Sequence, residues 1–501
     1  MFGLVRQRVF THFLGEGDVG DVVIISFRIP NLLQNLFGEG VLSASFIPVY
    51  ARLMADQREE EAGRVAGAVA GLLALVIAIV VALGVALTPL VVSVLAPGYT
   101  GAKRDLTIAL VRVLFPATGM LVLSAWCLGV LNSHRKFFVS YAAPVVWNLA
   151  IIVTAIAFRH GSLEHLGLMI AWGAVVGSAL QVLVQLPMVI ALSKGLRLSL
   201  RARDAQVRAV VRNFWPALLG RGVNQFSAYV DGIISTLLGT GAAMGLANAQ
   251  ILYTLPVSLF GMSISAAELP EMSSAQGSVD ERSAALKQRL EAGLTRIAFF
   301  IVPCAVAFLA LGESLAAIVF QSGRFTAADS RYVWGILAGS AVGLLAATLS
   351  RLVSSTFYAL GDTRTPLRFA IVRVVLTSVL GFLCAVPVPH LLGLELRWGA
   401  VGLTASAGFS AWIEFLLLKR ALGRRIGVPH LSGAYVARLW GAALLGAAAA
   451  WGVLLSTRHA LPSFVHATLA VLVYAAVYAG VTLAMRIPAA HALVPRSLRR
   501  A

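Results

Sequence analysis

The chain has 501 residues, of which 59% are hydrophobic and 12% are charged, and its mean hydropathy is +0.85. This composition excludes a soluble globular protein, because water cannot be the main solvent of so apolar a chain. The net charge of +18 would suit a nucleic-acid-binding protein, but such a protein needs its basic residues on one connected surface with interleaved aromatic rings. Short loops between apolar runs cannot offer that surface. We therefore expect membrane lipids, and no nucleic acid, as partners.

Apolar runs long enough to cross a bilayer recur along the chain. A hydrocarbon core about 30 Å thick needs roughly 20 apolar residues per helix, and long runs without alternation favour helices over a barrel. The sequence predicts an all-α polytopic membrane protein with about fourteen spans. In chain order they are 1–15, 20–50, 65–96, 107–131, 138–158, 166–193, 213–238, 243–272, 294–320, 332–360, 366–388, 398–418, 435–456 and 464–485. The pieces between them, 194–212 and 273–293 being the longest, are too short to be domains.

The basic residues are unevenly distributed among the loops. Most of the 40 Lys and Arg residues fall in alternate loops and in the C-terminal tail. Loops rich in Lys and Arg stay in the cytoplasm, so we expect both termini to be cytoplasmic. The opening stretch does not resemble a secretory signal, because Arg6, Arg8 and His12 interrupt it.

An internal repeat relates the second and eighth spans. FRIPNLLQNLFGEGVLSASFIP (27–48) aligns with LYTLPVSLFGMSISAAELP (252–270), and six spans per copy predict two parallel lobes. The predicted parts are an N-terminal lobe at 1–193, a basic cytoplasmic linker at 194–212, a C-terminal lobe at 213–420, and an extra helix pair with a basic tail at 421–501. Transporters commonly bind substrate between such lobes and rock them to alternate access; duplication kept only for packing is the alternative. The predicted helix breaks are Pro30, Gly38, Gly40, Pro256, Gly261 and Pro270.

Charges inside the spans are the candidate substrate contacts. A charge at a helix centre costs about 2.5–3.5 kcal/mol on insertion scales, so each one is a functional candidate. The basic candidates are Arg6, Arg8, Arg28, Arg112, Arg221, Arg351 and Arg373. The acidic candidates are Asp21, Glu39, Asp231, Glu268 and Glu414. Snorkelling to the membrane surface is an equal alternative for Arg8, Arg112 and Arg373.

One helix face in the seventh span is polar throughout. Arg221, Asn224, Gln225, Asp231 and Ser235 fall within an arc of roughly 120° at about 100° per residue, so this face must line protein or water. The tenth span repeats the pattern more weakly around Arg351. Guanidinium forks suit phosphate oxygens, so we predict an aqueous cavity for an anionic substrate. Internal salt bridges, Arg221 to Asp231 or Arg6 to Asp21, are the alternative.

Motifs of enzymes and metal sites are missing from the sequence. It has no P-loop, HExxH or GxSxG pattern, and Cys127, Cys304 and Cys384 lie singly in apolar runs. We therefore expect a transporter that is not an enzyme and that has no metal and no cofactor.

The segment GLVRQRVFTHFLGEGDVGDVVIISFRIPNLLQNLFGEGVLSASFIPVYARL (3–53) resembles the N-terminal signature of the MurJ/MviN family, with its PNLL, F-x-EG and FxP elements. The resemblance continues through APGY (96–99), AP-VVWN (143–148), QLP (185–187), FQSGRFTAAD (320–329) and FYALGDTRTP (357–366). It covers about the first 420 residues, and the last two spans match in number and hydrophobicity alone.

This resemblance implies the multidrug/oligosaccharidyl-lipid/polysaccharide exporter fold, with two lobes around a V-shaped cavity and an extra helix pair that shapes a groove for a polyprenyl tail. It implies a flippase that moves lipid II, the undecaprenyl-pyrophosphate-linked cell-wall precursor, to the outer leaflet of the bacterial inner membrane, and the cell-wall synthesis machinery as a further partner. By correspondence with the family's motifs, Arg6, Asp21, Glu39 and Arg351 are expected to contact substrate.

The sequence departs from the family at three places. Gln34 and Ile251 stand where the family usually has arginine, and the Ser-Arg that usually opens the first helix would lie upstream of Met1, so we expect a clipped first helix. Arg221 and Asp231 could restore charge to the cavity. The alternative functions are a flippase for another polyprenyl-linked oligosaccharide such as O-antigen or exopolysaccharide, a MATE-like exporter, and a non-transporting scaffold.

Overall fold

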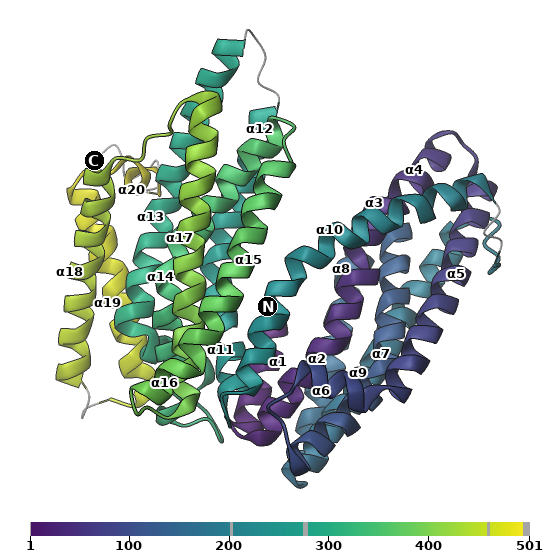
Figure 1. Ribbon diagram of the computed structural model, residues 1–501, viewed down its shortest axis with the longest axis horizontal. Coiled ribbons are helices and arrows are strands. Elements are labelled where there is room, and N and C mark those ends of the chain that lie inside the picture. Colours follow the sequence, from purple (N-terminus) through teal and green to yellow (C-terminus); the bar gives the residue numbers. More distant parts are fainter. Residues whose placement is uncertain (1, 201–203, 274–278, 458–460, 494–501) are drawn as a thin grey trace. The chain divides into compact units, whose positions relative to one another are not determined.

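The computed structural model of the chain describes residues 2–200, 204–273, 279–457 and 461–493. All regular elements in these ranges are helices (Figure 1), which confirms the predicted all-α class. Residue contacts divide the chain into two compact units, Met1–Met244 and Gly245–Ala501.

The first unit contains ten helices and the start of an eleventh within its described residues. They are α1 (Phe2–Leu14), α2 (Asp18–Phe37), α3 (Glu39–Ser45), α4 (Ile47–Ala55), α5 (Glu59–Ala86), α6 (Thr88–Leu95), α7 (Gly101–Ser133), α8 (Phe137–Ala157), α9 (Leu163–Leu192), α10 (Ala205–Thr236) and α11 (Ala242–Pro256). The second expected span is therefore three helices, α2 to α4, and the third is two, α5 and α6. Pro89 follows the break at Leu87, as expected of a residue that cannot continue a helix.

Helix α10 belongs to the first unit by its packing, since it contacts α2 and α3. The sequence repeat instead counts it as the first span of the second lobe. A repeat reflects duplication of the chain, whereas the units reflect contacts in the fold, so the two divisions need not coincide. The predicted boundaries at 193, 212 and 420 stay predictions.

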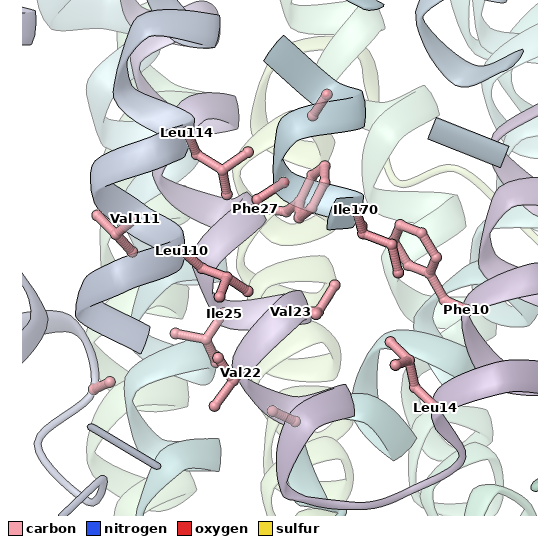
Figure 2. Packing of buried hydrophobic residues seen from close by; sticks show 14 of the residues in the cluster. Phe10, Leu14, Val22, Val23, Ile25, Phe27, Leu110, Val111, Leu114 and Ile170 are labelled. Carbon is pink, nitrogen blue, oxygen red and sulfur yellow. The ribbon is translucent and has the colours of Figure 1, made fainter. Parts of the chain in front are cut away.

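The core of the first unit joins helices that are far apart in the sequence. Figure 2 shows side chains from α1, α2, α7 and α9 packed together, and their labelled members are Phe10, Leu14, Val22, Val23, Ile25, Phe27, Leu110, Val111, Leu114 and Ile170. Each of these ten side chains is buried. Helix α1, though short, is thereby fixed against the rest of the unit.

The basic linker lies along α5. A Cβ built on Gly63, Gly67 or Gly71 would collide with the carbonyl oxygens of Lys194, Arg197 and Ser199, so only glycine allows the linker backbone to approach so closely. Lys194 Nζ also lies 2.7 Å from the Glu59 carboxylate at the start of α5. The segment that leads into α10 is therefore attached to the N-terminal half of α5.

The second unit contains the rest of α11 and the helices that follow it. They are the π-helix η1 (Val257–Met262), α12 (Ser263–Ser273), α13 (Val279–Phe320), α14 (Ala327–Ala359), α15 (Arg364–Ala385), α16 (Pro387–Leu391), the short 3-10 helix η2 (Leu396–Trp398), α17 (Gly399–Ile426), α18 (Gly433–Thr457), α19 (Ser463–Ala484) and α20 (Pro488–Leu493). Helices α14 and α17 approach closely where Gly343 meets Gly408, as small residues allow between membrane helices.

Helix α13 is much longer than the span predicted for it. It has 42 residues, or about 63 Å at 1.5 Å per residue, roughly twice the hydrocarbon thickness. The sequence places 273–293 between two spans, and from Val279 onward this piece is helical. A search for apolar runs finds only the membrane part of a helix, and the polar turns at the start of α13 lie outside such a run.

Two tyrosine hydroxyls of α19 attach the extra helix pair α18–α19 to α13. Pro303 lacks an N–H, so the Phe299 carbonyl one turn earlier loses its helical partner. The Tyr478 hydroxyl of α19 donates to that carbonyl at 2.7 Å. Tyr474 donates to the Pro303 carbonyl at 2.6 Å, so the pair satisfies polar backbone atoms that lipid could not.

Eleven helical stretches in the described parts of the chain are long and apolar enough to cross a membrane, by length and composition. They coincide with eleven of the expected spans, which confirms the polytopic class. Helices α1, α2 and α10 are not among them, because α1 has only 13 residues and the charged and amide side chains of the other two lower their hydropathy. The count of fourteen stays a prediction.

Candidate functional site

Arg6 lies on α1 with its guanidinium among three aromatic rings. Its Cζ is 4.9 Å from the ring centroid of Trp147, 5.8 Å from that of Phe10 and 5.9 Å from that of Phe27. Each distance is within the range of a cation–π interaction. Helices α1, α2 and α8 thus each contribute one ring around a single cation.

No described acidic side chain pairs with Arg6. The sequence left open a salt bridge to Asp21, and the structure contradicts it, because the Asp21 carboxylate pairs with Lys103 instead. Arg6 Nε is buried without a hydrogen-bond partner among the residues described. Ring faces stabilise a cation without using its N–H donors, so these three contacts do not occupy the donors of the guanidinium.

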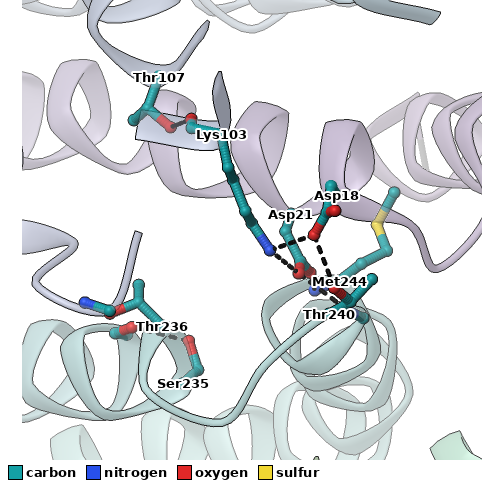
Figure 3. Close-up of polar contacts among 11 residues, drawn as sticks. Asp18, Asp21, Lys103, Thr107, Ser235, Thr236, Thr240 and Met244 are labelled. Carbon is teal, nitrogen blue, oxygen red and sulfur yellow. Dashed lines mark hydrogen bonds and ion pairs between the residues drawn. The ribbon is translucent and has the colours of Figure 1, made fainter. Parts of the chain in front are cut away.

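Asp21 is completely buried at the start of α2, with three donors around its carboxylate (Figure 3). Lys103 Nζ of α7 lies 2.9 Å from Oδ2. The backbone N–H groups of Gly241 and Met244 donate to Oδ2 at 2.8 Å and to Oδ1 at 2.9 Å. The carboxylate therefore caps the N-terminus of α11, where backbone N–H groups lack helical partners.

Asp18 extends the same network toward the surface. Its Oδ1 accepts from Lys103 Nζ at 2.7 Å and from the Thr240 hydroxyl at 2.7 Å (Figure 3). Lys103 also lies 4.4 Å from the ring centroid of Tyr99, in the APGY segment. Together these contacts join α2, α7 and the loop between α10 and α11. The predicted substrate contact of Asp21 stays a prediction; its observed contacts join these elements.

Arg28 of α2 is packed against α10. A Cβ on Gly232 would collide with its guanidinium, so glycine leaves the space that Arg28 occupies. The Tyr229 hydroxyl donates to the Arg28 carbonyl oxygen at 3.0 Å, and Asp231 interacts with Arg28 electrostatically. Arg28 and Asp231, two predicted site residues 203 positions apart in the chain, are thus brought together.

The rest of the predicted polar face of α10 cannot be compared with the structure. Arg221, Asn224 and Gln225 lie in α10, but their side chains are outside the described residues. The same holds for the side chains of Glu39, which begins α3, and Pro30, within α2. Their predicted contacts stay predictions.

Two aligned glycines of the repeat lie at irregular places in their helices. Gly38 separates α2 from α3, with φ −95° and ψ −135°, and a Cβ there would collide with the Gln34 carbonyl. Gly261 lies in the π-helix η1, where a Cβ would come 2.5 Å from Thr348 Cγ2. Both helices therefore depart from regular α-helix at the position where the repeat aligns a glycine.

The other predicted breaks lie near these two. Gly40 is inside α3, Pro256 is the last residue of α11 immediately before η1, and Pro270 is inside α12. Departures of this kind in membrane helices are frequently functional. That these positions move during transport stays a prediction.

A second group of charges lies in the second unit. Arg373 Nη1 of α15 is 3.3 Å from Glu414 Oε2 of α17, and Arg351 of α14 also interacts electrostatically with Glu414. Arg351 is exposed. An exposed arginine at membrane depth must face water or another polar group rather than lipid, so this part of α14 requires a polar environment.

The first unit also contains an apolar pocket of about 170 Å³. Helices α2, α3, α5 and α10 form it, and its lining residues are Phe37, Leu42, Val69, Leu72, Leu73, Val76, Val210, Val211, Phe214 and Trp215. Its lining suits a hydrocarbon chain. Across the described parts of the chain, no cluster of three or more His, Cys, Asp or Glu side chains could hold a metal ion.

The sequence did not mark Lys103 or Trp147 as candidates. For Arg373 it left open that the side chain snorkels to the membrane surface. Lys103 precedes the fourth expected span and was taken for a loop residue, and Trp147 is one aromatic residue in an apolar helix. No local pattern marks either of them. A lysine next to the APGY segment is the only signal that could have drawn attention to Lys103.

Comparison with known proteins identifies the family. The family described as "Lipid II flippase MurJ" matches residues 10–474. The lipid II flippase MurJ of Burkholderia cenocepacia is 29% identical over 433 residues, 84% of this chain and 81% of the relative. The probable lipid II flippase MurJ of Vibrio cholerae is 29% identical over 461 residues, 89% of this chain and 85% of the relative.

Solved structures share the fold. A lipid II flippase MurJ in an inward closed conformation matches with a TM-score of 0.79 and 21% identity, over 97% of this chain and 96% of that one. An inward-facing multidrug resistance MATE family transporter of the MOP superfamily matches with a TM-score of 0.68 and 17% identity, over 84% and 94%. The chain is a multi-pass membrane transporter and not an enzyme, and since the family match extends over nearly its whole length, it belongs to the lipid II flippase MurJ family.

Proposed function

We propose that this chain translocates lipid II from the inner to the outer leaflet of the bacterial cytoplasmic membrane. The observation that carries the proposal is the family match over residues 10–474. Lipid II carries a diphosphate between its polyprenyl chain and its sugar headgroup. A carrier for such a molecule needs cations at membrane depth for the diphosphate and an apolar surface for the chain.

Arginine supplies those cations in both units. Arg6 has ring faces around it and keeps its N–H donors, Arg28 is held against Gly232, and Arg351 is exposed on α14. Planar guanidinium groups bind phosphate oxygens through paired hydrogen bonds, which a lysine cannot provide. We infer that these three side chains contact the diphosphate at successive stages, with Asp231 adjusting the charge around Arg28.

The path across the membrane is proposed to follow alternating access. The internal repeat and the departures from regular helix at Gly38 and Gly261 support this mechanism, because such places let one part of a helix move relative to the other. The excess of Lys and Arg in alternate loops supports cytoplasmic termini. A direct contact with the cell-wall synthesis machinery remains an expectation from the family.

Complementation tests the proposal. The full chain is expressed in a bacterium whose own lipid II flippase can be depleted, and outer-leaflet lipid II is measured by its cleavage by an enzyme added outside the cells. We expect growth and normal outer-leaflet lipid II, with loss of both for Arg6→Ala at equal membrane abundance. Lysis of cells that contain the wild-type chain at normal abundance contradicts the proposal.

The fold likeness to a MATE family transporter does not favour drug export. A binding site for cationic drugs needs acidic side chains that are not already neutralised by a cation. The carboxylates of Asp21 and Glu414 are already paired, with Lys103 and Arg373. The described charges at membrane depth therefore favour an anionic substrate. Drug susceptibility of the same strain separates the two functions, because an exporter would raise resistance without preventing lysis.

A further inference from the structure

Three charged side chains of the second unit, Arg351, Arg373 and Glu414, interact within its candidate membrane spans, two of them as an ion pair. Helix α14 ends at Ala359 and α15 begins at Arg364, so Arg351 and Arg373 lie two to three turns from the same connecting loop and therefore at similar depth. Glu414 of α17 lies beside Arg373, with 3.3 Å between Oε2 and Nη1. Tyr253 of α11 interacts electrostatically with both arginines.

The charges of this group do not balance. Glu414 supplies one negative charge, and Arg351 and Arg373 supply two positive ones. The Arg373–Glu414 pair is the only ion pair that any of the three forms within the described ranges. A surplus cation in the membrane is costly unless an anion or water compensates it, so the group is suited to bind an anion.

The geometry of the ion pair leaves most of Arg373 available. The single contact runs through Nη1 at 3.3 Å, longer than the 2.7–2.9 Å typical of strong charge-assisted hydrogen bonds. Arg373 exposes 37% of its side chain, whereas Glu414 exposes 8%. A guanidinium has five N–H donors, so the accessible side of this pair is the cation.

We propose that Arg351 and Arg373 form an anion-binding site in the second unit for the diphosphate of a lipid-linked substrate, with Glu414 balancing the charge of Arg373 while the site is empty. This inference rests on the proposed function. A diphosphate carries at least two negative charges and accepts paired hydrogen bonds from two guanidinium groups. It therefore competes well against one carboxylate that makes one long contact.

Binding measurements on three variants separate this site from a purely structural ion pair. Undecaprenyl diphosphate is titrated against the full chain in lipid nanodiscs. Arg373→Gln should weaken binding about tenfold or more, Glu414→Gln should strengthen it because a competing negative charge is removed, and the double variant should stay weak. A structural pair predicts the opposite pattern: both single variants are harmed, and the double variant recovers. That recovery, or wild-type binding by Arg373→Gln, would overturn the proposal.

A matched control comes from α14, the helix that carries Arg351. Arg331 of α14 pairs with Glu313 of α13 at 3.4 Å, and both side chains are well exposed. Arg331→Gln removes one arginine and one ion pair, as Arg373→Gln does, and should leave diphosphate binding unchanged. If Arg373→Gln is unstable in detergent, Arg373→Lys retains the charge without the planar fork and should still bind at least several-fold more weakly; wild-type binding by the lysine variant counts against the site.

Inorganic pyrophosphate distinguishes the source of the anion. If it binds with the same dependence on Arg373 and undecaprenyl diphosphate does not bind, the site takes a free anion and the lipid-linked part of the proposal is wrong. Complementation separates the two proposals. Failure of the wild-type chain to complement, with Arg373-dependent binding intact, removes the proposed function and leaves a diphosphate-lipid site. Full complementation by Arg373→Gln, with unchanged binding, removes the site and leaves the function.

Discussion

The two units hold their intramembrane charges in different ways. In the first unit, Arg6 is surrounded by three rings, Arg28 occupies the space beside Gly232, and Asp21 is completely buried among three donors. In the second unit, Arg351 is exposed, and Arg373 keeps more than a third of its side chain accessible beside Glu414. The first unit encloses these three charges, although Arg8 and Arg112 of its spans are exposed, and the second unit leaves Arg351 and Arg373 accessible.

This difference predicts a different first consequence of substitution in each unit. When a buried charge loses one of its partners, the free energy of unfolding falls by about 3–5 kcal/mol. An exposed charge contributes little to stability, about 0–1 kcal/mol for a surface pair. We therefore expect substitutions of enclosed charges to lower stability first, and substitutions of accessible arginines to lower transport at nearly unchanged stability.

Asp21→Asn should have the largest effect on stability. The amide removes the charge that Lys103 and two backbone N–H groups stabilise, so we expect a loss of about 3 kcal/mol in the free energy of unfolding. Thermal unfolding of the purified protein in detergent measures it. Asp18→Asn is the control, because Asp18 is 58% exposed and pairs with the same Lys103; it should cost less than about 1 kcal/mol. Equal losses would show that burial of Asp21 does not matter.

Trp147 tests the ring cage of Arg6. Trp147→Leu removes the nearest ring and should cost about 2 kcal/mol, whereas Trp147→Phe keeps a ring face and should cost about half as much. A double-mutant cycle with Arg6→Met isolates the pairwise interaction, which we expect to be about 1 kcal/mol. No coupling between the two substitutions would mean that Trp147 fills space without holding the cation.

Arg351→Gln should leave stability unchanged within about 0.5 kcal/mol, since the side chain is exposed. Outer-leaflet lipid II in a depleted strain should nevertheless fall about tenfold, because a charge-assisted contact to the diphosphate is lost. Arg331→Gln on the same helix should change neither quantity. A loss of stability as large as that of Asp21→Asn would break the comparison between the units.

Sequence reasoning predicted the parts of the fold that hydropathy controls. Eleven spans coincide with helices, and the aligned glycines Gly38 and Gly261 lie at departures from regular helix. Membrane burial imposes these features locally, so a short window contains the signal. The polar part of α13 was placed between spans because no apolar run marks it.

The candidate site could be predicted only in part. Charge at membrane depth identified Arg6, Arg28, Asp21 and Arg351, because its cost depends on the residue itself and its place in a span. Their partners depend on tertiary packing. Lys103 is 82 positions from Asp21, and no periodicity connects them; the alternative of an Arg6–Asp21 salt bridge was wrong for that reason. Roles in substrate binding stay predictions for all these residues.

The smallest effect is expected at the loop between α14 and α15 of the second unit, where a pH change tests a charge that lies outside the predicted spans. Asp362 accepts hydrogen bonds from the Thr365 hydroxyl at 2.7 Å and from the backbone N–H groups of Thr365 and Arg364 at 3.0 Å, and it pairs with Arg425 at 2.6 Å. These contacts, the Thr365 hydroxyl first, hold the pKa of Asp362 below its ordinary value.

A lowered carboxyl pKa stabilises the fold above the ordinary value of about 4, and this contribution is lost as the pH falls through the lower pKa of the folded state. The unfolding temperature of the wild-type protein should therefore fall slightly more between pH 6 and pH 3 than that of Asp362→Asn, which has no charge to lose. The Asp362 side chain is partly exposed, with 14% of it accessible, and we expect a difference of a few degrees at most. Identical pH profiles would mean that water satisfies the contacts of Asp362 in this loop equally well.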